Sequence, residues 1–530
     1  MIRVNGIRAE LGQDFGDLIG ICGKKLKIKP GSIKSVRLAK KSVDARRKND
    51  VHFIISLDIE ASGEEQLLRR LKNAVVREPE DYIIPEVPEN AGRPVIIGFG
   101  PAGMFAALVL AMAGARPIVL ERGMDVDTRC RKVEDMRKNG VLDSECNVQF
   151  GEGGAGTFSD GKLNTGISDS RISWIFERLV EFGAPDEILY LAKPHIGTDK
   201  LRGAVKRLRE RVVSLGGEVR FGARFCGFSS DNGCISSVDY MCGGEKFSLP
   251  AENVILASGH SARDVFEMMK TAEISLSQKN FAVGVRIEHR RSDIDKAMYG
   301  SFAGHPALKA ADYKLAVHLQ NGRAVYTFCM CPGGKVIAAA SEHGRLAVNG
   351  MSCFARDDEN SNSALLVNVT SDDLEGSDPL AGMYLQREIE ERAFKAGGGG
   401  YRAPVSLVGD FLEKRRSEAL GGVRPSYAPG YGFALPDEYL PAFVCDALRE
   451  GITEMGRRIP GFDSPDAVLT GVESRSSSPV RIDRGDDLHS LSMRGLFPCG
   501  EGAGYAGGIV SAAVDGMKCA EAVLKRLKEK

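Results

Sequence analysis

The sequence predicts an α/β fold in which separated parts of the chain build one parallel sheet. Three observations lead to this prediction. A strand, a glycine turn, a helix and a second strand follow one another within Arg93–Arg122. A buried-strand pattern over Val254–Ala257 ends in a glycine, Gly259. The segment from Gly495 onward repeats the order strand, glycine turn and helix. Such alternation is typical of parallel sheets covered by helices.

The segment Arg93–Arg122, RPVIIGFGPAGMFAALVLAMAGARPIVLER, carries the most specific signal. Its three glycines form a G-x-G-x-x-G turn: Gly98 allows the tight bend, Gly100 lets the backbone approach a pyrophosphate, and Gly103 lets the helix pack against the strand. Glu121, after the second strand, is placed to accept hydrogen bonds from a ribose diol. We therefore predict a Rossmann-like dinucleotide site. A membrane span is disfavoured because glycine, proline and charges interrupt the apolar runs.

Composition narrows the class of protein. The chain has 530 residues, which suggests two or three domains, and 43% hydrophobic with 27% charged residues is ordinary for a soluble enzyme. Lys plus Arg and Asp plus Glu both total 71, so the whole chain offers no field that attracts nucleic acid or membrane. The first residues lack a secretory signal pattern, which makes the cytoplasm the expected compartment. Twelve cysteines without a C-x-x-C pair indicate reduced thiols and no metal site.

Five regions follow from the changes in pattern. We expect a small N-terminal α/β sandwich domain, an extended proline-rich linker, a first part of the nucleotide domain, an inserted α+β substrate domain, and a C-terminal return to the nucleotide domain, at 1–78, 79–92, 93–271, 272–470 and 471–530. Within the N-terminal domain the expected elements are strands at 2–4, 35–42 and 51–60 and helices at 14–25 and 63–76.

The N-terminal region is strongly basic. Residues 1–50 contain 13 Lys or Arg and 5 Asp or Glu, a net charge of +8. The cluster KSVDARRKND at Lys41–Asp50 could contact RNA or a phosphate, or it could be the solvated edge of a sheet, where lysines discourage pairing between edges. We favour the solvated edge, since the aromatic residues that single-strand binding uses are not interleaved with these charges.

Two further glycine-rich segments point to the same ligand. Gly151, Gly153 and Gly156 match G-x-G-x-x-G, but polar residues follow instead of an apolar helix. We interpret this run as a loop whose backbone amides approach the middle of a cofactor. Near the C-terminus, a helix is expected to begin at about Gly508–Ile509, and its free amides and positive dipole end suit an anionic or electron-rich cofactor edge.

Taken together, GFGPAGMFAALVLA, GGAGTFSDGKL, ILASGHSARD and CGEGAGYAGGIVSAAVDG resemble flavoproteins of the glutathione-reductase-like FAD superfamily. More closely, nearly the whole chain resembles the bacterial family labelled uncharacterised FAD-dependent, or NAD(FAD)-utilising, dehydrogenases. The resemblance implies a discontinuous Rossmann-like FAD-binding domain. It also extends to KSVDARRK, FAVGVRIEH and ESRSSSPVRIDR, although EHRR at Glu288–Arg291 lacks the proline that we would expect after the histidine.

The resemblance also implies which residues hold FAD. The first glycine turn would cradle the pyrophosphate, Glu121 would bind the adenosine ribose with Arg122 beside the adenine, and Glu501 would lie at the ribityl or pyrophosphate region. Amides from Gly507 to Ile509 would face the flavin O2 side. The full set of expected cofactor residues is Gly98, Gly100, Pro101, Ala102, Gly103, Glu121, Arg122, Gly153, Gly154, Ser159, Gly259, Gly500, Glu501, Gly507, Gly508 and Ile509.

The implied function is an FAD-dependent oxidoreductase, a dehydrogenase or reductase that passes a hydride of a small-molecule substrate through flavin N5. The substrate would meet the flavin between the nucleotide domain and the insert, and NAD(P)H, if it is the donor, would bind transiently. The alternative is an FAD-bearing, RNA-modifying or nucleic-acid-associated protein that docks RNA through the basic N-terminal domain.

Catalytic candidates are fewer. Cys329 and Cys331 alternate along a predicted strand, so both thiols would face one side; they are either redox-active or simply packed. Lys162 could polarise a substrate carbonyl, or it could be a solvated loop residue. His260, at a strand end, is expected to be structural rather than cofactor-facing. Arg475 and its neighbours could bind an anion or form a surface turn.

Overall fold

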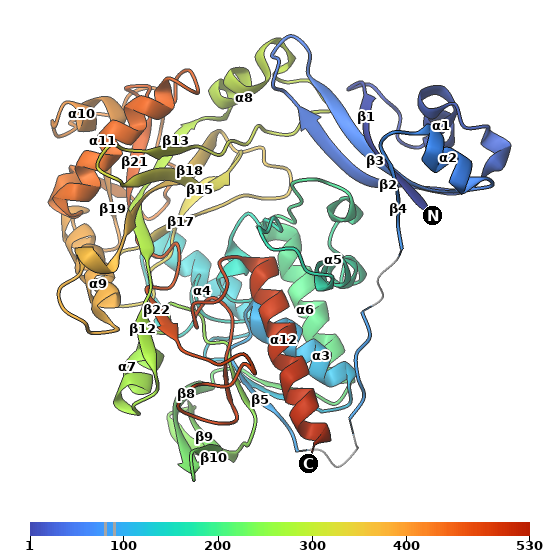
Figure 1. Ribbon diagram of the computed structural model, residues 1–530. Coiled ribbons are helices and arrows are strands. Elements are labelled where there is room, and N and C mark those ends of the chain that lie inside the picture. The colour runs from blue at the N-terminus through green and yellow to red at the C-terminus, as the bar shows by residue number, and fades with distance from the viewer. Residues whose placement is uncertain (79–81, 88–91, 530) are drawn as a thin grey trace.

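The computed structural model describes residues 1–78, 82–87 and 92–529, and it has the predicted mixed α/β architecture (Figure 1). The N-terminal sheet stands apart at one side of the molecule. The C-terminal helix crosses the predicted nucleotide-binding part, residues 93–271 and 471–530, beside a helix from near residue 100. Of the predicted linker, residues 79–81 and 88–91 lie outside the described residues. The described part, 82–87, contains no helix or strand, and its Tyr82 hydroxyl donates to Glu521 Oε1 at 2.6 Å.

The N-terminal domain is an antiparallel sheet in the order β2-β3-β1-β4, with two helices. Its elements are β1 (Ile2–Ala9), α1 (Leu18–Leu26), β2 (Ile33–Asp44), β3 (His52–Ala61), α2 (Glu64–Arg70) and β4 (Ala74–Val76). The helix predicted over 63–76 is wrong in its last part. It ends at Arg70, and residues 74–76 pair with Ile2–Val4, because a strand edge is available to β-branched Val75 and Val76.

The nucleotide-binding part contains a five-stranded parallel sheet in the order β23-β11-β5-β6-β7. Its strands are β5 (Val95–Ile97), β6 (Ile118–Leu120), β7 (Glu218–Arg220), β11 (Val254–Leu256) and β23 (Leu496–Pro498). Strands that are distant in the sequence are therefore neighbours in the sheet, as the sequence predicts. The three central strands are completely apolar, as expected when both faces of a parallel sheet are covered.

Alternate residues of these strands serve two cores. Ile96 and Val119 pack with a layer of helices, whereas Val95 and Ile118 pack with a second, antiparallel sheet. The helical layer contains α3 (Pro101–Met112), α5 (Arg171–Glu181), α6 (Thr198–Ser214) and α12 (Ile509–Lys528). The antiparallel sheet consists of β8 (Arg224–Asp231), β9 (Cys234–Cys242) and β10 (Glu245–Pro250). α4 (Val126–Asn139) follows β6 along the chain.

The inserted region is built on a seven-stranded sheet in the order β14-β15-β18-β13-β21-β19-β20. Its strands are β13 (Phe281–Arg290), β14 (Ala316–His318), β15 (Ala324–Cys331), β18 (Asn360–Val369), β19 (Ala403–Leu407), β20 (Tyr431–Phe433) and β21 (Val468–Glu473). Its helices are α8 (Arg291–Tyr299), α9 (Ala381–Ala396), α10 (Val408–Leu412) and α11 (Ala442–Gly456). The chain enters and leaves this region through a paired β12 (Leu276–Gln278) and β22 (Val480–Ile482), and α7 (Arg263–Thr271) precedes the entry. A small hairpin, β16 (Lys335–Ala338) and β17 (Val348–Met351), lies beside it.

The basic cluster of the N-terminal domain lies on and after β2, which is an edge strand of its sheet. Three of its basic side chains contact the protein itself: Arg46 pairs with Asp44 at 2.5 Å, Lys48 donates to the Met298 carbonyl, and Lys41 lies 4.3 Å from the ring centre of Phe53. These contacts support the interpretation of the cluster as a sheet edge. Within the described ranges, none of the helices has the length and apolar composition needed to cross a membrane.

Candidate cofactor site and an adjoining thiol site

The carboxyl ends of β5, β11 and β23 meet at one edge of the parallel sheet, and the predicted glycine segments meet with them. A Cβ atom at Gly98 would lie 2.5 Å from the Ala257 carbonyl oxygen, and one at Gly500 would lie 2.9 Å from Ala102 Cβ. A Cβ at Gly502 would lie 2.6 Å from the Gly259 carbonyl carbon. Ligands of open α/β sheets bind at such an edge, so the fold forms one candidate site from four separated segments.

The first glycine turn has the geometry that its spacing predicts. Gly98 has φ +96°, in the left-handed region that glycine tolerates, and a Cβ at Gly103 would clash with the Gly98 carbonyl oxygen. α3 begins at Pro101, and its N-cap residue is Gly100, which has no side chain to bind the first amides. Its first amides therefore remain available for an anion, and the positive end of the helix dipole favours one there.

The Glu121 carboxylate is more constrained than the sequence indicates. It is 4% exposed, and it accepts hydrogen bonds from the Phe99 amide at 2.7 Å and from the Gly123 and Gly151 amides at 2.9 Å each. A carboxylate offers about four lone-pair positions, so one remains on Oε2 for a ribose hydroxyl. These three hydrogen bonds from backbone amides hold the first and second glycine loops against each other.

Arg122 is held by acids. Its guanidinium donates to Glu145 at 3.0 Å and to Asp264 at 2.9 Å, and it lies 4.2 Å from the ring centre of Phe150. The side chain is 13% exposed. It therefore forms part of the wall beside the expected adenine position, and its charge is largely compensated.

The second glycine run lies against the first, as a loop. The Gly153 amide donates to the Phe99 carbonyl at 2.8 Å, and a Cβ at Gly154 would lie 2.8 Å from Gly100 Cα. A Cβ at Gly156 would lie 3.2 Å from the Ile509 side chain. The loop thus reaches from the first glycine turn to the start of α12. Ser159 shapes this loop from within, since its hydroxyl donates to the Gly156 carbonyl at 2.7 Å.

A fully buried arginine of α4 binds the backbone of this loop. Arg129 is 0% exposed and donates to four backbone carbonyls: Asn147 at 2.8 Å, Val148 at 2.8 Å, Glu152 at 2.7 Å and Gly151 at 3.3 Å. Burial lowers the pKa of Arg129 to about 10. The Asn147 and Val148 carbonyls have no other hydrogen-bond partner among the described residues, whereas the Gly151 carbonyl also accepts from the Gly154 amide and the Glu152 carbonyl also accepts from Thr157 Oγ1.

The C-terminal glycine turn is the open part of the site. A Cβ at Gly507 would meet nothing within 4 Å, and the same holds for Gly259 on the neighbouring strand end. α12 begins at Ile509 without a side-chain cap, so its first amides are available. Glu501 Oε1 lies 3.3 Å from His260 Nδ1, and the buried His260 Nε2 lacks a hydrogen-bond partner among the described residues. Open glycines, free helix amides and an unpartnered buried nitrogen fit a polar ligand with a planar ring.

The three catalytic candidates lie together where this loop meets the insert. Lys162 Nζ and Arg286 Nη2 each lie 3.9 Å from Cys331 Sγ, and the Cys331 thiol donates to the Cys329 carbonyl at 3.3 Å. The predicted simple alternation is wrong. β15 has a bulge between Phe328 and Cys331, with Cys329 at φ +42°, and this bulge brings the sulfurs together.

The surroundings of the thiols are charged and buried. Arg286 is 0% exposed and donates to Glu473 at 3.2 Å and to the Cys329 carbonyl at 2.9 Å. Hydrogen bonding from Cys331, together with Lys162 and Arg286, lowers the pKa of Cys329, and the same coupling with burial raises the pKa of Cys331. Burial raises the pKa of Glu473 to about 7.

A second charged group supports Lys162 from the loop side. Asp160 is 1% exposed, lies 3.4 Å from Lys162 Nζ and forms a 2.5 Å ion pair with Arg356. The Lys162 and Arg356 cations hold the pKa of Asp160 well below its usual range despite burial. His195 pairs with Lys162 through a backbone bridge, and burial lowers the pKa of its imidazole to about 4. Lys162 is therefore a positioned charge and not a solvated loop residue.

Arg475 belongs to a different group. It is buried and pairs with Glu390 at 2.8 Å, and Arg263 pairs with the same carboxylate at 2.7 Å. This ion-pair network joins the insert to α7. Arg475 is therefore not the surface turn that the sequence allowed, and its charge is compensated by Glu390.

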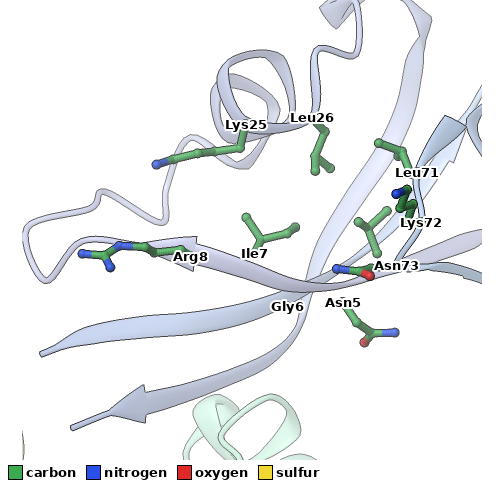
Figure 2. Close-up of a pocket in the computed structure, with 10 residues that line it drawn as sticks. Asn5, Gly6, Ile7, Arg8, Lys25, Leu26, Leu71, Lys72 and Asn73 are labelled. Carbon is green, nitrogen blue, oxygen red and sulfur yellow. The ribbon is translucent and has the colours of Figure 1, made fainter. Parts of the chain in front are cut away.

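Two other places were candidate sites on geometry alone. Cys499, Asp515 and Cys519 are buried with ligand atoms within 4.8 Å of one another, but Arg484 already pairs with Asp515 at 2.6 Å, which disfavours a metal cation. A pocket of about 310 Å³ opens in the N-terminal domain between β1, α1 and the end of α2 (Figure 2). Its lining includes Arg8, Lys25 and Lys72 but no acid, cysteine or histidine.

Comparison with known protein families gives two matches along the chain. Residues 280–476 match the family described as FAD-dependent protein, C-terminal domain-like, and residues 1–60 match a domain of unknown function (DUF8436). An uncharacterised protein from Clostridium beijerinckii is 48% identical over 530 residues, which cover 99% of each chain. The chain belongs to the family of this clostridial protein. The family match lies in the insert and includes Arg286, Cys329 and Cys331.

Solved structures resemble the chain only distantly. The flavin-dependent brominase Bmp2 has a TM-score of 0.40 at 13% identity, with 83% of this chain and 80% of that chain covered. A flavoprotein/dehydrogenase from Cytophaga hutchinsonii has a TM-score of 0.35 at 11% identity, covering 83% and 79%.

Sequence reasoning missed Arg129, Arg286 and Glu473. Arg286 had a usable signal, since a charge within the otherwise apolar strand FAVGVRIEH has to be buried and paired. Arg129 had none, because α4 is rich in charged residues that look equally solvated.

Proposed function

We propose that the protein is an FAD-dependent oxidoreductase that acts on a small-molecule substrate, and that its nucleotide-binding part is related to the glutathione-reductase-like flavoproteins. One observation carries the proposal: the first glycine turn, the end of β11 and the final glycine turn lie side by side at one sheet edge, with the N-terminus of α12 open beside them. The match of residues 280–476 to an FAD-dependent family supports it.

The residues present would hold the cofactor in an extended form. The amides at the start of α3 would bind the pyrophosphate, and the remaining lone pair of Glu121 would bind the adenosine ribose. Glu501 would lie along the ribityl chain, and the open backbone at Gly507 and Gly508 would face the pyrimidine edge of the flavin. The bound flavin supplies two-electron chemistry at N5, and the amides of α12 would stabilise the negative charge of its reduced form.

The substrate would bind between the second glycine loop and the sheet of the insert, where Lys162, Cys329 and Arg286 meet. These cations favour a substrate that is anionic or that develops negative charge. In the part of the chain that the structure describes, the five-stranded sheet is the one fully parallel sheet, so we propose that an NAD(P)H donor binds transiently over the flavin and not in a separate nucleotide domain.

Anaerobic flavin reduction tests this function. The purified protein is expected to absorb at about 450 nm, and addition of NADH or NADPH should bleach this band, which a two-electron acceptor then restores. Flavin that is bound and photoreducible, yet unreactive toward every donor and acceptor tried, would show that the flavin has a structural role and would contradict the proposal.

A further inference from the structure

Cys329 and Cys331 lie two residues apart at the bulged end of β15, and two cations, Lys162 and Arg286, each lie 3.9 Å from Cys331 Sγ. The bulge in β15 makes this possible, since it places Cys329 at φ +42° and inserts one extra residue opposite β18. Cys331 Sγ also lies 3.3 Å from the Cys329 carbonyl oxygen.

The two thiols are not equivalent. Cys329 is partly exposed, whereas Cys331 is 0% exposed and lies between Lys162 and Arg286. A molecule that approaches from solvent can therefore reach Cys329 first, and Cys331 can react only with a group already attached to Cys329. A reachable attacking thiol and a buried resolving thiol are the arrangement that disulfide exchange requires.

The charges around the pair favour an anionic sulfur. Lys162 and Arg286 lie beside Cys331 Sγ, and each is also ion-paired, with Asp160 at 3.4 Å and Glu473 at 3.2 Å respectively. Hydrogen bonding within the pair and the two cations lower the pKa of Cys329, while the pKa of Cys331 is raised. These directions make Cys329 the thiol that ionises first, while Cys331, which donates to the Cys329 carbonyl, keeps its proton.

We propose that Cys329 and Cys331 form a redox-active dithiol that reduces small-molecule disulfides, with Cys329 attacking and Cys331 resolving. The Cys329 thiolate attacks one sulfur of the substrate, the substrate S–S bond breaks, and the first thiolate leaves with the proton of Cys331. The Cys331 sulfur then attacks Cys329 Sγ, the mixed disulfide breaks, and the second substrate thiolate leaves. Two electrons pass to the substrate, and the protein is left with a Cys329–Cys331 disulfide.

Return of the dithiol to its reduced state rests on the proposed function, in which a reduced flavin supplies the two electrons. The second glycine loop connects the two places. It carries Gly156 against Ile509 at the start of α12, and six residues later it carries Lys162 against Cys331. The exchange reaction itself needs no flavin, so the two ideas can be tested separately.

One tryptic peptide reports on the reaction. AVYTFCMCPGGK, residues 324–335, contains both thiols and no other cysteine. The reduced protein is treated with oxidised glutathione without oxygen, quenched with N-ethylmaleimide and digested. We expect this peptide to appear as an internal disulfide without maleimide, with release of about two equivalents of glutathione per chain. Recovery of the peptide with maleimide on both cysteines would overturn the proposal.

Variants assign the roles. Cys331→Ser should stop at a glutathione adduct on Cys329, and Cys329→Ser should release no glutathione. Cys226→Ser, at a partly exposed thiol of β8, is the matched control and should behave as the unchanged protein. An adduct on Cys331 in the Cys329→Ser variant would contradict the assignment. If either variant fails to fold, the peptide result on the unchanged protein still decides between the outcomes.

The pH profile of alkylation is a second readout. Between pH 7 and 8 the rate at Cys329 should change by less than about twofold, whereas the rate at Cys226 should rise about tenfold, because burial raises the pKa of Cys226 and its thiolate fraction grows with pH. In the Lys162→Gln variant the alkylation rate at Cys329 should rise with pH, whereas in the Lys162→Arg variant it should change as little as in the unchanged protein. Parallel profiles at the two cysteines would contradict the thiolate assignment.

The same peptide distinguishes failure of this proposal from failure of the proposed function. Protein that carries no flavin but forms the internal disulfide supports the dithiol and removes the flavin. Protein that carries flavin but whose Cys329 and Cys331 both react with maleimide after glutathione treatment supports the flavin and removes the dithiol. If the protein both carries flavin and forms the internal disulfide, addition of NAD(P)H should reduce this disulfide, so that both cysteines again react with maleimide.

Discussion

Replacement of Arg129 by lysine is expected to destabilise the protein strongly while the charge is kept. The Arg129 guanidinium satisfies four buried backbone carbonyls, at 2.7–3.3 Å, from three nitrogens on a planar fork. A lysine ammonium is a single point and reaches about two of them. Among the described residues, only the Asn147 and Val148 carbonyls depend on Arg129 alone. Loss of one or both, at about 1–3 kcal/mol each, should lower the free energy of unfolding by about 1–6 kcal/mol.

Urea denaturation followed by circular dichroism measures this loss, and Arg131→Lys on the same helix is the matched control. Arg131 is exposed and donates to Thr128 Oγ1, so its replacement should change the free energy of unfolding by less than about 0.5 kcal/mol. Because Arg129 shapes the second glycine loop, bound flavin should also be lost at lower urea than the global transition. Equal stabilities of the two variants would refute the role assigned to this arginine.

Two pH-dependent predictions follow from buried titratable groups. The pKa of His195 is lowered to about 4, so the unfolded chain binds more protons than the folded chain below pH 6.5, and stability falls on acidification. His195→Gln should therefore lose about 2 kcal/mol less stability between pH 7 and pH 5 than the unchanged protein. Identical losses in the two proteins would contradict this. The pKa of Glu473 is raised from 4.5 to about 7, so the folded chain binds more protons between these values and stability falls as pH rises. Glu473→Gln should therefore reduce the fall in stability between pH 5 and pH 8 by about 2 kcal/mol, measured by urea titration at each pH, and an unchanged slope would show that this carboxyl is ionised in the folded protein.

The sequence predicted the nucleotide-binding part well because its signals are local and redundant. A glycine at position 103 and a strand–turn–helix around it leave few alternatives, and β5, α3 and β6 follow one another within the predicted segment Arg93–Arg122. The joining of distant strands in one sheet was also predictable, since the segment after Gly495 repeats the pattern of the first glycine turn.

The rest depends on tertiary contacts that one sequence does not reveal. Residues 74–76 look helical in isolation, but they pair with β1 because that edge is free. The bulge at Cys329 has no proline or glycine to announce it. The approach of Lys162 to Cys331 joins residues 169 positions apart, and Arg286 meets Glu473 over 187 positions. A charged residue in an apolar strand predicts burial with a partner, but it does not say which partner.

Flavin binding by a variant at Gly507 tests the central claim most directly. A side chain at this position meets nothing within 4 Å, and the same holds for the control position Gly12 in the N-terminal domain, so both Gly507→Asp and Gly12→Asp should fold normally. If the distant glycine turns form one FAD groove, Gly507→Asp places a bulky anion at the flavin edge and the α12 N-terminus. We expect its Kd for FAD, from fluorescence titration of the flavin-free protein, to rise at least about tenfold, which corresponds to about 1.4 kcal/mol. Gly12→Asp should keep the original Kd and one FAD per chain. Equal affinities of Gly507→Asp, Gly12→Asp and the unchanged protein, or no FAD bound to any of them, would contradict the account.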